Sequence, residues 1–160
     1  MIIIHLKVIM KKFIFTVMLV LVCVTSSAQQ SLFNKYAETK GISSVYISKA
    51  MLGMMDKVKA GKNDIGKIAG KLEHVQIMSC ERPSMIAVVK RDALDALKKE
   101  GFEQMMQVND DGENVGIYHK AHHNNRNEFT LLCVEGSNEL QVINILGNVT
   151  MKEIKDLMAR

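Results

Sequence analysis

The sequence has no tryptophan, a single proline and an aromatic content of only 5%. It also has no low-complexity tract, no internal repeat and no linker that would separate two domains. Hydrophobic residues make up 48% of the chain and charged residues 24%. These proportions are typical of one globular domain, which can bury a core without metal or disulfide support.

Several catalytic and cofactor-binding patterns are missing as well. The chain has no Gly-x-Ser-x-Gly elbow of the kind that holds a catalytic serine. The segment Gly61–Lys67 resembles a phosphate-binding loop, but Ile68 stands where such a loop needs Ser or Thr. The segment Asp110–Glu113 lacks the further oxygen ligands of an EF-hand calcium loop. No cofactor is therefore expected.

The first 28 residues have the pattern of a cleavable signal peptide. Lys11 and Lys12 precede an apolar run over residues 13–24, and small residues follow, including Ser26 and Ala28 at the positions that a signal peptidase reads. The apolar run is too short to cross a bilayer, which takes about 20 residues. We expect cleavage after Ala28, which would leave one domain over residues 29–160 and no stable membrane span.

Two alternatives within this segment stay open. Translation could begin at Met10 instead of Met1, because Met10-Lys11-Lys12 would itself make an ordinary signal start. Cys23 invites a lipoprotein interpretation, but it lies deep in the apolar run and follows Val22, where a small residue is expected. We therefore expect an exported protein, periplasmic or secreted, in preference to a lipoprotein.

Little positive charge is left once the signal segment is set aside. The full chain has a formal charge of +4, and residues 1–28 contribute three lysines and no acid. The remainder has 18 basic and 17 acidic residues, a net charge of +1. A nucleic-acid footprint needs a clustered basic face, so no nucleic-acid partner is expected.

Hydrophobic periodicity in the mature part predicts the order α-β-α-β-α-β-β-β-β-α. The predicted helices are Ser31–Glu38, Lys49–Val58, Pro83–Lys99 and Thr150–Met158. The predicted strands are Ser44–Ser48, Leu72–Ser79, Phe102–Val108, Val115–Lys120, Glu128–Val134 and Leu140–Leu146. The glycine-rich stretch Gly61–Gly70 is expected to be a loop or a broken helix.

Local signals join the last four strands into a predicted antiparallel meander. Asp110-Asp111-Gly112 and Gly136-Ser137-Asn138 are typical hairpin connections. Thr150 and Glu153 have the spacing of a capping box that opens the last helix. The expected fold class is α+β, an antiparallel sheet built on this meander with helices packed mainly on one face.

The two faces of this sheet are expected to differ. One face should meet the helix Pro83–Lys99 through the helical stripe of Ile86, Val89 and Leu97. The other face should leave room for a ligand or partner, with Gln104, Tyr118 and Thr130 as its candidate residues. A β-bulge in one strand would move the residues beyond it to the opposite face.

Three segments resemble a known family. They are Ser44–Met51, Asp110–Val115 and Ile145–Thr150, and their order along the chain is more specific than any one of them. Together they are similar to the "domain of unknown function 4252" family of small exported proteins of Gram-negative bacteria. The resemblance spans essentially the whole mature chain and implies localisation and fold. It implies no activity and no catalytic residue. Many members look like lipoproteins, and this chain departs from them at Cys23.

Two side-chain clusters could bind a metal. His119, His122 and His123 lie within five residues, and imidazole is a common transition-metal ligand. This stretch is polar and joins two predicted strands, so an exposed hairpin loop is the simpler interpretation.

Met51, Met54 and Met55 share one face of a predicted helix, and thioethers can hold copper(I). The same spacing is what a helix needs to pack on a core, and methionine commonly fills cores. Met105 and Met106 add to the unusual methionine content without changing this interpretation.

Cys80 and Cys133 remain after cleavage. An even number of cysteines in an exported chain permits a disulfide, and the pair could form only if their strands are close. The alternative is two isolated thiols. No spacing identifies a base that would activate either thiol as a nucleophile.

The function expected from these observations is that of a non-enzymatic binding or regulatory module of the cell envelope, with an envelope protein as a possible partner. The competing hypothesis is an extracytoplasmic hydrolase or a copper- or zinc-handling protein whose site is assembled from distant residues. A convergent polar pocket with titratable groups would favour the competitor. An exposed apolar patch would favour the binding module.

Overall fold

The computed structural model describes residues 28–54, 59–60, 63–64, 66 and 68–158. The predicted signal peptide, except Ala28, lies outside the described residues, as does Met55 of the methionine cluster. Within the described part every helix is too short or too polar to span a lipid bilayer.

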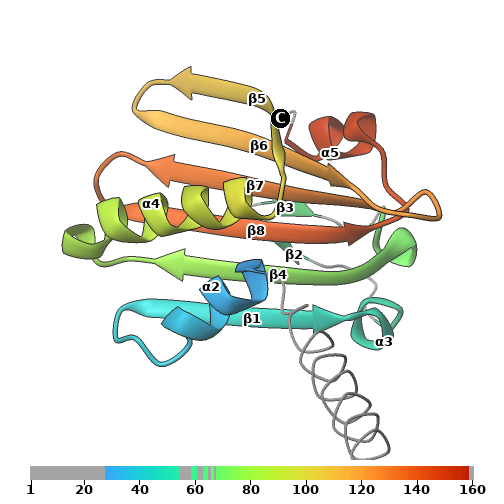
Figure 1. The fold of residues 1–160 in the computed structure, drawn as a ribbon, viewed down its shortest axis with the longest axis horizontal. Coiled ribbons are helices and arrows are strands. Elements are labelled where there is room, and N and C mark those ends of the chain that lie inside the picture. Colours follow the sequence, from blue (N-terminus) through green and yellow to red (C-terminus); the bar gives the residue numbers. More distant parts are fainter. Residues whose placement is uncertain (1–27, 55–58, 61–62, 65, 67, 159–160) are drawn as a thin grey trace, which may run out of the picture.

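One six-stranded antiparallel sheet, in the order β1-β4-β8-β7-β6-β5, forms the centre of the molecule (Figure 1). Its strands are β1 Ile42–Ser48, β4 Leu72–Cys80, β5 Glu103–Asp110, β6 Glu113–Ala121, β7 Asn127–Glu135 and β8 Glu139–Gly147. The helices are α2 Ala28–Tyr36, α3 Lys49–Leu52, α4 Pro83–Lys99 and α5 Met151–Met158. The fold class is α+β, as predicted.

Tight turns set the register of the four C-terminal strands. Asp111 and Gly112 both have positive φ, at 40° and 86°, as a two-residue hairpin turn between twisted strands requires. Gly136, with φ 57°, begins the connection between β7 and β8. The strands pair consecutively, β5 with β6, β6 with β7 and β7 with β8.

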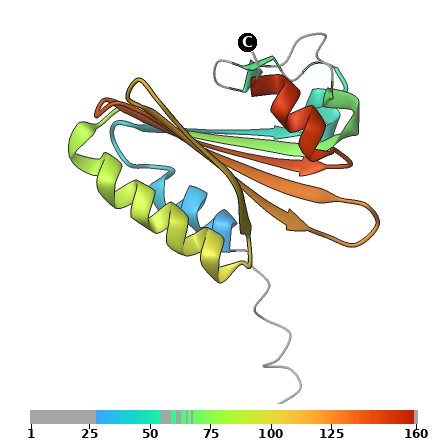
Figure 2. The ribbon, with the colours of Figure 1, turned by 90° about the horizontal axis from the view of Figure 1, so that it is seen from above.

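Helices cover both faces of the sheet (Figure 2), which the sequence analysis did not anticipate. We call the side that carries α2 and α4 the α4 face, and the side that carries α3 and α5 the α5 face. Strand alternation sends Leu132, Leu140 and Val142 to the α4 face, where they pack with residues of α2 and α4. The alternate residues Ile143 and Ile145 join the α5-face core together with Ile154 of α5.

Helix α4 has the bounds that the sequence predicts, and its expected stripe is buried. Ile86, Val89 and Leu97 are all less than 9% exposed. Pro83 occupies the first helical turn, where its missing N–H is not needed. Gly101, with φ 77°, follows the helix end at Glu100 and releases the chain into β5.

The predicted free face was wrong. Tyr118 packs against the α4-face core, and Thr130 is fully buried on that same face. Gln104 lies opposite Tyr118 in register and therefore shares its side of the sheet. The error arose because β8 is apolar on both faces, so alternation alone does not show which face α4 covers.

The predicted helix Lys49–Val58 was also wrong in extent. Helix α3 ends at Leu52, with Gly53 as its cap, and residues 55–58 lie outside the described residues. Leu52, at 2% exposure, is the side chain that α3 buries, whereas Met51 and Met54 are 53% and 83% exposed. A single turn, started by Ser48 as N-cap, is enough to bring Leu52 into the α5-face core.

The stretch Gly61–Gly70, predicted as a loop or broken helix, and the residues directly beside it contain short regular elements. Two-residue strands, β2 Lys59–Ala60 and β3 Asn63–Asp64, pair antiparallel, and a 3-10 turn, η1, covers Ala69–Lys71. Ile68 and Ala69 at this turn are buried in the α5-face core.

The capping box of α5 is formed as predicted and is extended by an ion pair. The backbone N–H of Glu153 donates to the Thr150 hydroxyl at 3.3 Å, and the Thr150 N–H donates to the Glu153 carboxylate at 2.8 Å. Lys71 donates to the same carboxylate at 2.5 Å. These contacts hold the pKa of Glu153 near 2, mainly through Lys71.

We predict that Gly147→Ala strongly destabilises the fold. A Cβ at Gly147 would lie against the backbone oxygen of Lys71 and 2.8 Å from the Cα of Leu72, and backbone atoms cannot yield as a side-chain end can. Urea unfolding should show a loss of at least about 2 kcal/mol. The matched control is Gly70→Ala, because a Cβ there meets nothing within 4 Å. Equal stability of the two variants would contradict this close approach.

Candidate functional site

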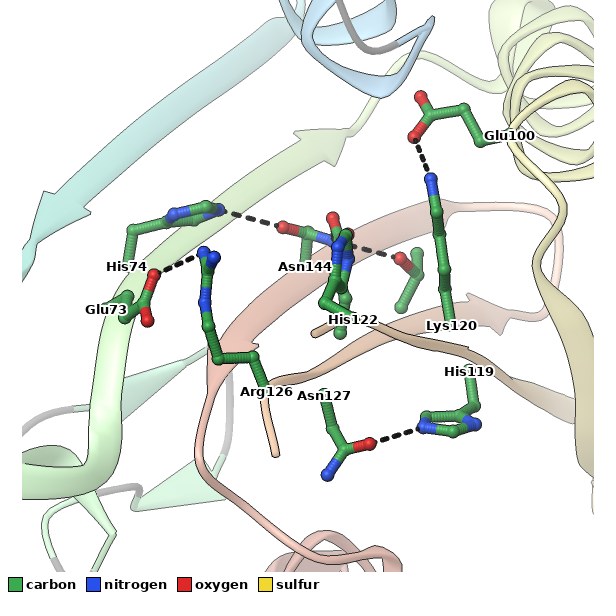
Figure 3. A network of polar contacts seen from close by, with 11 residues as sticks. Glu73, His74, Glu100, His119, Lys120, His122, Arg126, Asn127 and Asn144 are labelled. Atoms are coloured by element: carbon green, nitrogen blue, oxygen red, sulfur yellow. Dashed lines mark hydrogen bonds and ion pairs between the residues drawn. The ribbon is translucent and has the colours of Figure 1, made fainter. Parts of the chain in front are cut away.

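A chain of hydrogen-bonded polar side chains crosses three neighbouring strands on the α4 face and reaches the loop after β6, beside the C-terminal end of α4 (Figure 3). We call it the polar ladder, and its members are His74 of β4, Asn144 of β8, Glu128 and Thr130 of β7, and His122, which follows β6. Asn144 and Thr130 are 1% and 0% exposed. The ladder therefore places polar groups in a largely apolar sheet interior, where Gln76, opposite Asn144 in register and 6% exposed, is a further buried polar residue.

Asn144 is the central member of the ladder. Its amide nitrogen donates to the Glu128 carboxylate at 2.9 Å and to the Thr130 hydroxyl at 3.1 Å. Its amide oxygen lies 3.2 Å from Nε2 of His74. Because an amide oxygen only accepts, His74 must carry a proton on Nε2 in this arrangement.

The Glu128 carboxylate joins the buried part of the ladder to its exposed end. One oxygen accepts from Asn144, and the other lies 2.6 Å from Nε2 of His122. Glu128 itself is 9% exposed, so the carboxylate is held between two fixed partners. Such a group is preorganised for recognition, since it loses little freedom when something binds beside it.

The loop between β6 and β7 brings the exposed groups to one end of the sheet. The backbone N–H of His122 donates to the carbonyl of Arg126 at 2.8 Å and closes the loop. Asn124 and Asn125 have φ of 62° and 56°, a left-handed conformation that asparagine tolerates better than most residues. His122 and Arg126 therefore stand side by side at the mouth of this hairpin.

Three cationic or protonatable side chains form what we call the cationic rim: Lys120, His122 and Arg126. Each is paired with a carboxylate, Lys120 with Glu100 at 3.8 Å, His122 with Glu128 at 2.6 Å and Arg126 with Glu73 at 2.6 Å.

In the first two of these pairs the carboxylate lies behind its cation. The side chains of Lys120 and His122 are 29% and 28% exposed, against 6% for Glu100 and 12% for Glu128. The Arg126–Glu73 pair is about equally open on both sides. The side chains exposed to solvent at this end of the sheet are therefore mainly cationic or protonatable.

Glu100, the C-cap of α4, has a strongly perturbed acidity. Burial raises the pKa of its carboxyl to about 7, and the negative charge of Glu128 adds to the rise, while Lys120 opposes it. A carboxyl group with this pKa exchanges its proton near neutral pH, as acid–base residues do. Titratable side chains of Glu100, Lys120 and Glu128 therefore lie near one another at this end of the sheet.

The three candidate histidines do not come together. His119 lies on the α5 face, where its ring stacks on Phe129 at 4.8 Å and Nε2 lies 2.9 Å from Asn127. His122 lies on the α4 face in the ladder, and His123 is exposed in the loop. Among the described residues, no group of three His, Cys, Asp or Glu side chains is placed to hold a metal ion.

The two candidate methionines that the structure describes, Met51 and Met54, are not buried as a core face. Met51 and Met54 project from the α3 turn next to β1, while Met105 and Met106 lie on β5 at the opposite edge of the sheet. Four strands therefore lie between the two methionine groups, which cannot share one copper ion.

The two cysteines are free thiols on opposite faces. Cys80 is buried in the α4-face core, whereas Cys133 packs against the α5-face core, and β8 separates their strands. Burial, with a smaller effect of Glu113, raises the pKa of Cys133 to about 11. Cys133 is therefore a protonated thiol and not an activated nucleophile.

Sequence reasoning missed the ladder and named only its members His122 and Thr130. A usable signal was present, since Asn144 interrupts the apolar strand Leu140–Leu146 at its centre. A polar residue inside such a strand needs buried partners. The partners are on two other strands, β4 and β7, so only the strand register identifies them.

The fold and this site define a class of α+β protein with an antiparallel sheet, two covered faces and a polar network on one of them. The family described as "Domain of unknown function (DUF4252)" matches residues 36–157, and the chain belongs to this family. The match confirms the resemblance of the three sequence segments. The chain has no detectable similarity to a curated protein or to a solved structure.

We predict that Glu100→Gln stabilises the protein at pH 8 and not at pH 4. The native carboxyl, with its pKa near 7, holds its proton between about pH 4.5 and 7 while the unfolded chain has released it. Rising pH therefore destabilises the native state, and glutamine removes this effect. The gain at pH 8 should be on the order of 1 kcal/mol, because partial solvent access screens the charge.

Urea unfolding at both pH values measures this gain, with Glu103→Gln on exposed β5 as the control. A loss of stability at pH 8, or the same change at both pH values, would contradict the raised pKa.

Proposed function

We propose that the protein is an exported, non-enzymatic binding module of the cell envelope, and that it binds a ligand bearing a carboxylate at the cationic rim. The N-terminal pattern of basic residues, apolar run and small residues supports export. The single observation that carries the binding role is the polar ladder, because buried polar side chains are costly for a fold that needs only apolar packing at those positions.

The arrangement of charge supports an anionic ligand. Lys120 and His122 reach solvent while their carboxylate partners lie behind them. The Lys120 ammonium lies 3.8 Å from Glu100, a longer separation than the 2.6 Å of the other two pairs. The buried Nε of Arg126 has no hydrogen-bond partner among the described residues. A carboxylate is a group that lysine and arginine donors bind through charge-assisted hydrogen bonds.

The acidity of Glu100 gives this binding a pH dependence. When Glu100 is protonated, Lys120 loses a competing carboxylate and is free to contact the ligand. A bound carboxylate in turn favours the protonated form of Glu100, because like charges repel. Binding should therefore be tighter at pH 6 than at pH 8.

A hydrolase is the second candidate, and the raised pKa of Glu100 is the observation that favours it. The rest of the site supports binding better. Thr130, the hydroxyl in the ladder, is fully buried and already accepts from Asn144. Both Glu128 oxygens are occupied by fixed partners, which suits a recognition surface more than a base that must move a proton.

The test is titration of the purified, isotopically labelled protein with succinate, and with succinamide as a matched probe without charge. We expect succinate to shift the backbone amide signals of residues 120–128 and 144, and succinamide to leave them in place. Lys120→Ala and Arg126→Ala should each weaken succinate binding about tenfold, which corresponds to about 1.4 kcal/mol. Lys98→Ala, an exposed lysine of α4, is the control.

Two results would contradict the proposal. If succinate and succinamide shifted the amide signals equally, charge would play no part in binding. If the shifted signals came from residues outside the β6–β7 end, the rim would not be the binding site. Hydrolysis of an ester or amide of succinic acid by the parent protein, but not by the Glu100→Gln variant, would show that the protein is a hydrolase and not a binding module.

A further inference from the structure

Strand β1 is an edge of the sheet that lacks the features which usually protect an edge from pairing (Figure 1). Its seven residues, Ile42–Ser48, contain no charge and no proline. Its register with β4 runs without a bulge. Val45 and Tyr46, which are adjacent in this strand, are 50% and 60% exposed.

The opposite edge, β5, is protected in two ways. Its pairing with β6 is broken by a bulge between Gln104 and Met106, which bends the strand. It also begins with Glu103 and ends with Asp110, charged residues that discourage pairing with another strand. The contrast singles out β1 as the edge that is built to be covered.

The hydrogen-bond pattern shows which backbone groups of β1 point outward. The carbonyl of Gly41 accepts from the N–H of Glu81 at 3.1 Å, and residues directly opposite in an antiparallel pair alternate in bonding. The backbone groups of Val45 therefore point to β4, and those of Ser44 and Tyr46 point to the open edge. Ile42 agrees with this alternation, because its N–H turns away from β4 to the carbonyl of Thr39.

We propose that β1 pairs antiparallel with β1 of a second copy of this chain, about a two-fold axis at Val45. Ser44 of one copy then lies opposite Tyr46 of the other, and both exchange backbone hydrogen bonds. Ser44 and Tyr46 lie symmetrically about Val45, so the outward N–H and C=O groups of each residue bond to the other residue in the second copy. An isologous interface requires this self-complementarity. The two sheets become one continuous sheet.

Charge and packing favour a second copy over a different partner. Because β1 has no charged residue, it cannot form ion pairs with a charged segment of another protein. Two copies of β1 can pair without repulsion between charges along the strand. Tyr46 is already held in place, since its ring lies against His74 at 5.6 Å on the α4 face. On the α5 face the two Val45 side chains meet at the axis, where cross-strand β-branched pairs are favourable.

The pairing also concerns the polar ladder, although it does not depend on the proposed ligand. His74 contacts Tyr46 on one side and Asn144 on the other. A strand added at β1 covers Tyr46 and so limits the movement of His74. The two ladders of the dimer would lie on the same side of one sheet, each at its own end.

Sedimentation equilibrium of the purified protein tests the proposal, at concentrations up to about 100 µM. We expect a dimer, and Val45→Lys should raise its dissociation constant at least about tenfold, because two ammonium groups meet at the axis. Val108→Lys is the matched control, since Val108 is 42% exposed on the protected edge. It should leave the dimer intact.

Ser44→Pro is a second variant, because it removes an outward N–H without touching the pairs to β4. It should abolish the dimer while its thermal unfolding stays close to that of the parent. A protein that is monomeric throughout this range would overturn the proposal. So would a dimer that tolerates both β1 substitutions, or one that Val108→Lys breaks as readily as Val45→Lys. Binding of an unrelated extended peptide at β1 by a monomer would replace the second copy as the occupant.

Discussion

The side-chain amide of Asn144 is the interaction on which the polar half of the sheet depends. It is nearly inaccessible to solvent and connects Glu128, Thr130 and His74, which come from two other strands. Without it, a buried carboxylate and a buried hydroxyl would lose a donor, which costs more than a hydrogen bond between exposed groups contributes. The orientation of Glu128, and through it that of His122, follows from this amide.

At the end of the sheet where the ladder meets the rim, burial and charge oppose each other. Burial beside Glu128 makes the charge on Glu100 unfavourable and raises its pKa to about 7, and Lys120 only partly offsets this. A domain selected for stability alone would fill this region with apolar side chains, as it does under α2 and α4. On our proposal, the polar residues form a recognition surface, where the cations Lys120 and Arg126 need preorganised neighbours.

Much of the fold follows from local signals, and most of the site does not. The capping box at Thr150 and the turn at Gly112 act through neighbouring backbone atoms, so they could be predicted from the sequence alone. The face on which Tyr118 lies could not, because it depends on how α4 crosses a sheet that is apolar on both sides. The three histidines were adjacent in sequence, but strand alternation and the loop send them in different directions. Glu100 and His74 are distant in sequence: strand register places His74 beside Asn144, whereas the packing of α4 on the sheet places Glu100 beside Lys120.

The most direct test of this account is to replace the buried part of the ladder by apolar side chains of similar size, in the triple variant Glu128→Leu, Thr130→Val and Asn144→Leu. The measurement is the urea unfolding free energy of the variant, together with its affinity for succinate. If the ladder serves recognition, the variant should be as stable as the parent or more stable, and its succinate binding should be lost. A loss of more than about 2 kcal/mol in unfolding free energy, or succinate binding as tight as before, would contradict the account.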